Sequence, residues 1–247
     1  MPTDAPIPKI LYQTWETREL SPKMTAARAT WLEKNPDWTH VLADKDDRRA
    51  LVESHSAEAL KAYDTLKIGA FKADLWRYCQ LYKTGGFYAD IDSVCVVPID
   101  DYLEEDDQFI AAAATPREDG SLGWVVANGL LGVRPGHPFL KRVIERGIEE
   151  ILAGEVDGFY AIGPSGLGIS INQVLGRDAK AQNRAGRYDG YRLLEKKGIR
   201  FFNNGTCVFL AEYEGYKDDL KDIGAQHWRD EMKTPSLLDR LKRKLRG

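Results

Sequence analysis

Two aspartates separated by one residue are the feature of the sequence with the clearest chemical potential. Asp90 and Asp92 close the segment GGFYADID, which begins at Gly85. If Phe87 to Ile91 is a strand, the alternation of side chains points both carboxylates into one space. Two close negative charges raise one pKa unless a cation lies between them, and Mg²⁺ or Mn²⁺ prefers such oxygen ligands. The spacing indicates a divalent-metal site, with a solvated turn as the alternative because short motifs recur by chance.

A helix with a broad apolar stripe is predicted immediately before these aspartates. Asp74 and Arg77 lie beside the stripe, three residues apart. They form either a surface ion pair of little energetic value or a pair that borders both the core and a ligand-binding cleft. Gly85-Gly86 ends the helix. The stripe recurs with helical spacing and comprises Phe71, Leu75, Tyr78, Cys79 and Tyr82.

The remaining chain alternates between strand and helix patterns, which favours an α/β layer architecture. No internal repeat or composition break is present, so we expect one domain over residues 1–235. Beyond Gly154, glycine is frequent and periodicity is weak. Helices are expected at 22–34, in two pieces within 44–62, and at 137–152. Strands are expected at 9–14, 39–43, 87–91, 93–97, 108–114, 127–133, 199–202 and 207–210.

Composition excludes several classes of protein. The chain has 247 residues, 30% of them charged, and a formal net charge of −3, which argues against a general nucleic-acid binder. The three cysteines are far apart and form no Cys-x-x-Cys pair, so neither a disulfide framework nor a zinc site is expected. A reducing compartment fits this cysteine usage. The first residues lack the pattern of a signal peptide, and no run reaches the length of a membrane span. We expect a cytoplasmic protein.

The last twelve residues, 236–247, predict a basic amphipathic helix. Four leucines share one face of it, at positions 237, 238, 241 and 245. Five lysines and arginines fall between 240 and 246. Such a helix binds anionic membrane surfaces, which would place the protein peripherally on the inner face of the membrane. The alternative is a terminal helix that packs on the domain.

The stretch FKADLWRYCQLYKTGGFYADID resembles the sugar-nucleotide-binding motif of glycosyltransferase family 32, whose members include polysaccharide-building and mannosyl-type transferases. The family pattern is Asp-x-x-Arg in a helix, then Leu-Tyr, Gly-Gly, an aromatic pair and Asp-x-Asp. Here Asp74, Arg77, Tyr88, Asp90 and Asp92 fall in register with it.

Other segments resemble the family in the same order along the chain. IPKILYQTW resembles the opening strand, with Gln13 and Trp15 where the nucleotide base is received. ANGLLGV resembles the strand near the donor sugar and the acceptor, with Asn128 and the glycine after it. Gly163-Pro164 matches a Gly-Pro loop, and AQHWRDEM resembles the C-terminal segment whose histidine, His227 here, completes the metal site. The further Ser-Trp of many relatives is not found in this sequence.

The resemblance implies a GT-A fold, with a mostly parallel central sheet flanked by helices and a small antiparallel addition. It implies a retaining, metal-dependent transferase that moves a hexose from a UDP- or GDP-sugar to a glycan or lipid-linked acceptor. Asp90, Asp92 and His227 would bind Mn²⁺ or Mg²⁺. The donor would be bound by Gln13, Trp15, Asp74, Arg77, Tyr88, Asp90, Gly163 and Pro164, and catalysis would depend on Asp74, Arg77 and Asn128.

Simpler interpretations remain for several of these residues. Trp15 is alternatively a core aromatic, Asn128 a turn cap, and GPSGLG a turn-rich loop. A non-catalytic interaction protein on the same scaffold is the alternative function. A glycoside hydrolase fits less well, because its two carboxyl groups flank the scissile bond. No phosphate-binding P-loop and no Ser-His-Asp pattern is present.

Overall fold

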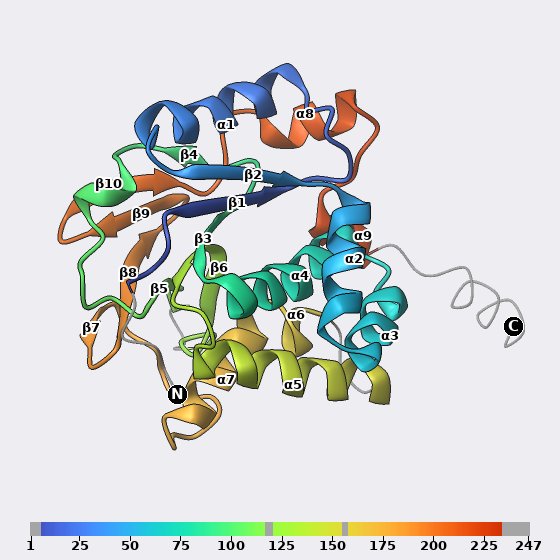
Figure 1. Ribbon diagram of the computed structural model, residues 1–247, viewed down its shortest axis with the longest axis vertical. Coiled ribbons are helices and arrows are strands. Elements are labelled where there is room, and N and C mark those ends of the chain that lie inside the picture. Colours follow the sequence, from blue (N-terminus) through green and yellow to red (C-terminus); the bar gives the residue numbers. More distant parts are fainter. Residues whose placement is uncertain (1–5, 117–120, 155–157, 234–247) are drawn as a thin grey trace, which may run out of the picture.

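A computed structural model describes residues 6–116, 121–154 and 158–233 of the chain (Figure 1). The first helices begin where the sequence provides capping groups. Helix α1 (Pro22–Lys34) follows Ser21, whose hydroxyl accepts a hydrogen bond from the Met24 amide at 3.1 Å. Helix α2 (Lys45–His55) opens with a capping box between Asp44 and Asp47, and α3 (Ala57–Thr65) follows directly. The predicted helix at 22–34 and the pair within 44–62 are therefore confirmed.

Helix α4 (Gly69–Thr84) carries the predicted apolar stripe and ends at the predicted glycines. Gly85 has φ of 65°, a conformation that favours glycine. A Cβ at this position would also lie 2.7 Å from the ring of Pro135. The chain therefore turns tightly and enters strand β3 (Gly86–Ala89).

The strands form one ten-stranded mixed sheet with the order β2-β1-β3-β6-β5-β8-β9-β10-β4, and β7 pairs with β8. In the part from β2 to β8, β6 is reversed and its five companions point the same way. The strands beyond β8 pair antiparallel. The prediction of a mostly parallel sheet with a small antiparallel addition is confirmed. The bounds are β1 Ile10–Thr14, β2 Thr39–Ala43, β4 Val94–Cys95, β5 Phe109–Ala113, β6 Val126–Val133, β7 Gly186–Tyr188, β8 Tyr191–Lys197, β9 Arg200–Asn203 and β10 Thr206–Leu210.

Side-chain alternation sends each central strand into two cores. On β3, Phe87 packs into one cluster with Trp31 of α1, whereas Tyr88 packs into the other with Trp76 of α4. Figure 1 shows α1 and α8 (Tyr216–Asp222) on one side of the sheet, and α4, α5 (Pro138–Ala153) and α7 (Pro164–Val174) on the other. The sheet is therefore covered on both faces. A ligand can then reach β1 and β3 at their carboxyl ends, where the strands stop.

The C-terminal half holds elements that periodicity did not reveal. Strand β8 pairs parallel with β5 although its second residue is Arg192. That arginine is buried, and it forms an ion pair with the buried Asp107 and donates to the carbonyl of Tyr102 at 2.5 Å. Because the partners cancel the charge, a strand with a charged residue still packs in the core. The other unpredicted elements of this half are strand β7 and helices α6 (Gly158–Ala161), α7, α8 and α9 (Trp228–Lys233). A 3₁₀ turn, Ile99–Asp101, was also not predicted in the first half of the chain.

Two further observations concern membrane spans and the C-terminal end of the chain. No helix within the described residues is long and apolar enough to cross a membrane. The predicted helix at 236–247 lies outside the described residues, so the division into 1–235 and 236–247 stays a prediction.

Candidate active site

Helix α4 and strand β6 meet in a buried polar network. Asp74 and Arg77 form an ion pair at 3.2 Å, and their side chains are 8% and 5% exposed. The amide nitrogen of Asn128, on β6, donates to Asp74 at 2.9 Å and to the hydroxyl of Tyr78 at 2.8 Å. The alternative of a surface ion pair is therefore wrong, since both charges lie under the protein surface. The alternative of Asn128 as a turn cap is also wrong, because this residue lies within a strand.

Arg77 joins this network to the first aspartate of the D-x-D motif. One guanidinium nitrogen lies 3.1 Å from the Asp90 carboxylate, and the same nitrogen donates to the backbone carbonyl of Asn128 at 2.8 Å. The guanidinium also stacks on the Tyr88 ring, 4.1 Å from its centre. Burial acts to lower the pKa of Arg77, but the Tyr88 hydroxyl and the charges of Asp90 and Asp74 outweigh it and raise the pKa. Arg77 is thus a permanent cation at the centre of the site.

The D-x-D residues lie in a turn and not on a strand. Strand β3 ends at Ala89, two residues before the predicted end, and Ile91-Asp92 form the turn. The carbonyl of Asp90 accepts hydrogen bonds from the Ser93 amide at 3.1 Å and from Gln13 at 3.3 Å. Because these two donors satisfy the Asp90 carbonyl, it needs no hydrogen bond from a neighbouring strand, and strand β3 ends before Asp90. Strand alternation is therefore the wrong explanation for the geometry of the two aspartates.

The Asp90 side chain is held on one oxygen and open on the other side. Its Oδ1 accepts from the Tyr88 hydroxyl at 2.7 Å. The backbone amide of Asp90 donates to the Gly129 carbonyl at 2.9 Å. A Cβ on Gly129 would lie 2.4 Å from Oδ2 of Asp90, so only glycine leaves room for this carboxylate. The Asp90 side chain is 36% exposed, which leaves it accessible to a ligand.

Asp92 lies in surroundings that disfavour its ionised form. Burial raises its pKa well above the ordinary value, and the charges of Asp90 and Glu212 add to the increase. This means that the two aspartates are electrostatically close and that a cation beside them would favour the ionised form. Hard carboxylate oxygens are the donors that Mg²⁺ and Mn²⁺ prefer, so the residues fit the predicted metal. No cluster of three or more His, Cys, Asp or Glu suited to hold a metal is found within the described part of the chain.

A C-terminal segment that the sequence analysis did not single out packs against this turn. The Tyr213 amide donates to the Asp92 carbonyl at 2.8 Å. The hydroxyls of Tyr213 and Ser21 both bind the buried Asp219, which ties the segment to the N-terminus of α1. Tyr216 contacts the Tyr213 ring, and its pKa is raised by burial and by the charges of Asp92 and Asp90. No motif signalled this contact, because it depends on chain segments that are far apart.

The residues predicted to receive the base lie at the carboxyl end of β1. Gln13 is buried and touches the D-x-D turn through Asp90, as given above. Trp15 follows the strand and is half-buried; its carbonyl accepts from Arg48 at 3.1 Å. This end of a strand in an α/β sheet is where ligand crevices form. The position suits Trp15 for stacking on a base, and that role stays a prediction.

Two further predicted groups are placed without a direct bond to the aspartates. Gly163 precedes Pro164, which opens α7, and a Cβ on Gly163 would lie 2.9 Å from the backbone of Phe159. The segment GPSGLG is therefore the start of a helix, so the alternative of a turn-rich loop is wrong. Contact of Gly163 and Pro164 with a ligand stays a prediction. The ring of His227 lies 6.3 Å from that of Tyr216, centre to centre, and its role as a metal ligand also stays a prediction.

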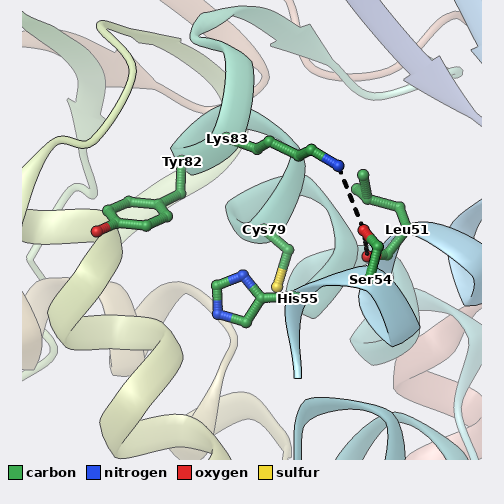
Figure 2. A pocket seen from close by; sticks show the side chains of 6 residues that line it. All are labelled: Leu51, Ser54, His55, Cys79, Tyr82 and Lys83. Carbon is green, nitrogen blue, oxygen red and sulfur yellow. Dashed lines mark hydrogen bonds between the residues drawn. The ribbon is translucent and has the colours of Figure 1, made fainter. Parts of the chain in front are cut away.

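A cavity of about 230 Å³ between α2 and α4 lies away from these residues (Figure 2). Leu51, Ser54 and His55 line one side, and Cys79, Tyr82 and Lys83 line the other. Figure 2 shows Cys79 and His55 at the same opening. Burial raises the pKa of Cys79 to about 12, and burial together with Lys83 lowers the pKa of His55. A neutral thiol beside a neutral imidazole does not form the thiolate pair that a cysteine nucleophile needs.

Comparison with solved structures identifies the class of fold. The structure titled "PaToxG Glycosyltransferase" aligns over 70% of this chain and 71% of its own, with a TM-score of 0.52 and 16% sequence identity. The arrangement of sheet and helices is therefore the GT-A type, as the sequence predicted. At this identity the likeness establishes the fold alone.

Sequence comparison finds a family that matches part of the chain. Residues 21–110 match the family described as "Glycosyltransferase sugar-binding region containing DXD motif". Inositol phosphoceramide mannosyltransferase 3 of Schizosaccharomyces pombe is 33% identical over 140 residues, 57% of this chain and 37% of the relative. Inositol phosphoceramide mannosyltransferase 2 of the same yeast is 27% identical over 227 residues, 90% of this chain and 61% of the relative. These matches support a relation of the family-32 type over the part of the chain that carries the D-x-D motif. The chain spans between about a third and two thirds of the length of these relatives.

Proposed function

We propose that the protein is a metal-dependent glycosyltransferase that moves a hexose from a nucleoside diphosphate sugar to a glycan or lipid-linked acceptor. The observation that carries this proposal is the single network in which Arg77 joins Asp74 and Asn128 to Asp90. It places hydrogen-bonding groups suited to a sugar beside carboxylates suited to a metal. The names of the yeast relatives support mannose as one hexose to test.

Asp90 and Asp92 would hold the divalent ion. A bound Mn²⁺ or Mg²⁺ would neutralise the charge that develops on the departing nucleoside diphosphate. The protein supplies two carboxylates from one turn, and Mg²⁺-type sites commonly share their remaining positions with substrate phosphates and water. His227 is proposed as a further ligand, since it lies beside the C-terminal segment that packs on Asp92.

The donor sugar would lie against α4 and β6. Asp74 accepts hydrogen bonds and Arg77 donates them. The amide nitrogen of Asn128 already donates to Asp74 and Tyr78, which leaves its oxygen to accept, so the three match the hydroxyl pattern of a hexose. Gln13 and Trp15 would receive the base at the end of β1, Tyr88 supports Arg77 and Asp90, and Gly163-Pro164 would close the donor side. Because most of these groups are already buried and bonded to one another, they would orient the donor without further ordering.

No described residue near the anomeric position is arranged as a nucleophile with an adjacent base. Arg77 and Asp90 are committed to each other, and burial raises the pKa of Asp74 to about 7 in spite of the charge on Arg77. We therefore favour front-face displacement with retention, in which the leaving phosphate takes the proton of the acceptor hydroxyl.

The proposal is tested by diphosphate release from a panel of nucleotide sugars, including GDP-mannose and UDP-glucose, in the presence of Mn²⁺. We expect turnover with one donor, its loss on addition of EDTA, and its return with excess Mn²⁺ or Mg²⁺. The control reaction contains nucleotide sugar and Mn²⁺ without protein. Full activity in a metal-free preparation would contradict the metal role. Binding of a nucleotide sugar without any turnover, with acceptors supplied, would favour a non-catalytic binding protein.

We also propose that residues 236–247 hold the protein at an anionic membrane surface, on the inner face of the membrane. The support is the sequence pattern: four leucines on one helical face and five cationic residues around them. Each lysine or arginine near such a surface contributes about 1 kcal/mol, screened by salt. This arrangement would bring the site close to a lipid-linked acceptor.

Co-sedimentation with phosphatidylserine-containing liposomes tests the tail. We expect the full chain to bind, the binding to weaken as salt rises, and a chain that ends at residue 235 to stay in the supernatant. Activity of the shortened chain on a small soluble acceptor should persist, since no described site residue lies in the tail. Equal sedimentation of both proteins, or of neither, contradicts the proposal.

A further inference from the structure

Tyr78 reaches the candidate site from the hydrophobic core. Its side chain is fully buried and belongs to the apolar stripe of α4. Its hydroxyl nevertheless lies 2.8 Å from the side-chain nitrogen of Asn128 on β6. A buried hydroxyl in such a stripe has a packing role and a polar role at once. The polar role is the one that bears on the candidate site.

The hydrogen bonds of Asn128 fix which way its amide points. The nitrogen carries two hydrogens, and these go to Asp74 at 2.9 Å and to Tyr78 at 2.8 Å. Asp74 is ionised above its pKa of about 7, and its carboxylate, paired with Arg77, then accepts hydrogen bonds and does not donate them. The nitrogen must therefore face Asp74 and Tyr78, and the oxygen must face away from them. Among the described residues, none donates a hydrogen bond to that oxygen.

The surroundings of Asn128 connect its backbone to Arg77 and to the D-x-D turn. Its backbone carbonyl accepts from Arg77 at 2.8 Å, and the next carbonyl, of Gly129, accepts from the Asp90 amide at 2.9 Å. Asn128 is 6% exposed, so its side chain is held by protein on nearly all sides. A rigid amide with one polar atom free of protein partners suits recognition of a single hydroxyl group.

We propose that Tyr78 is a positioning residue, which together with Asp74 holds the Asn128 amide so that its oxygen accepts a hydrogen bond from a hydroxyl of the bound sugar. This inference rests on the proposed function. It adds the direction of one hydrogen bond, in which a sugar hydroxyl donates and the Asn128 oxygen accepts. An amide in the opposite orientation would donate to the sugar. The two orientations discriminate differently between a hydroxyl and a fluorine, because fluorine has no hydrogen to donate.

Tyr78→Phe keeps the ring and removes the hydroxyl, which frees one amide hydrogen of Asn128. We expect kcat/KM for the nucleotide sugar, and its affinity by calorimetry, to fall by about tenfold or more. The affinity for the nucleoside diphosphate alone should change by less than about twofold, since that ligand lacks the sugar. The matched control is Tyr12→Phe, another buried tyrosine of the same core, whose hydroxyl lies 3.0 Å from that of Thr84. This control should leave both affinities unchanged.

Two further measurements separate positioning from mere packing. The first uses a set of nucleotide sugars in which one sugar hydroxyl at a time is replaced by fluorine. For one of them we expect the affinity for the parent protein to fall by at least about tenfold. The same replacement should cost less than about twofold in affinity for Tyr78→Phe and for Asn128→Ala. Side-chain amide signals of ¹⁵N-labelled asparagine give a readout without ligand. The signal that Asn128→Ala removes should exchange slowly at both hydrogens in the parent, and Tyr78→Phe should make one of them fast.

The outcomes distinguish this inference from the proposed function. A parent that binds no nucleotide sugar refutes the proposed function, and this inference with it. Sugar binding in the parent with unchanged donor affinity in Tyr78→Phe overturns the role of Tyr78 alone. Rapid exchange of both Asn128 amide hydrogens in the parent, or equal tolerance of every fluorinated donor, overturns the orientation of the amide.

Discussion

Replacing Arg77 with alanine should reduce kcat/KM for the nucleotide sugar by at least about a thousandfold and should also destabilise the fold. The catalytic loss follows because Arg77 is the group that connects Asp74, Asn128 and Asp90, and a lost charge-assisted contact in a dry site costs several kcal/mol of transition-state stabilisation. The stability loss should be about 3–5 kcal/mol, because the buried Asp74 is left without its cation. Urea denaturation and donor kinetics measure the two effects.

Two other variants give this prediction its controls. Arg77→Lys keeps the charge but not the planar group that stacks on Tyr88, so it should recover part of the stability and little of the activity. Arg49→Ala removes an exposed partner of Asp64, with both side chains nearly half exposed, and should cost less than about 1 kcal/mol. Normal donor kinetics in Arg77→Ala would show that the buried pair only supports the fold.

Local signals were sufficient for the parts of the fold that local chemistry determines. Ser21-Pro22 predicted the start of α1, and Gly85-Gly86 predicted the end of α4, because a cap and a left-handed backbone depend on the residues themselves. Strand β8 and helix α7 escaped prediction. Arg192 breaks the apolar pattern of β8 and is tolerated there only because Asp107, 85 residues earlier, neutralises it.

The candidate site, like the fold, was predictable from the sequence only in part. The resemblance in register identified Asp74, Arg77 and Asp90, and the structure brings these together. Their burial was not predictable, since the spacing of Asp74 and Arg77 equally suits a surface pair. Tyr213 and Tyr216 were missed because they meet the D-x-D turn through packing, without a sequence pattern of their own.

The geometry of the aspartates differs from the one that strand alternation predicted. Strand alternation predicted that Asp90 and Asp92 share one space. The chain instead leaves β3 after Ala89, and a turn held by Ser93 and Gln13 follows. The charge of Asp90 contributes to the raised pKa of Asp92, so the two carboxylates interact electrostatically. A turn exposes the Asp90 side chain more than a central strand would, which suits a residue that must meet a ligand.

Replacing Asp92 with asparagine should lower kcat by at least about a thousandfold without unfolding the protein. The proposed ion loses a charged ligand, and metal stabilisation of a leaving group is worth several kcal/mol. The effect on stability has the opposite sign. Because the folded state raises the pKa of Asp92 above its unfolded value, this group stabilises the fold below the unfolded pKa, and that contribution is lost as pH rises through the folded pKa. At neutral pH and without metal, the asparagine variant should therefore be at least as stable as the parent.

Thermal melting with and without Mn²⁺ measures the stability of the variant and its ability to bind the ion. Mn²⁺ should raise the Tm of the parent, since a ligand of the native state stabilises it by mass action, and should leave the Tm of Asp92→Asn unchanged. Asp37→Asn, a change at an exposed aspartate in the loop after α1, is the control and should respond to Mn²⁺ as the parent does. A variant at position 92 that keeps the Mn²⁺ response together with parental kcat would mean that Asp92 is not a metal ligand. A variant that loses kcat and keeps the Mn²⁺ response would place Asp92 at the substrate and the ion elsewhere.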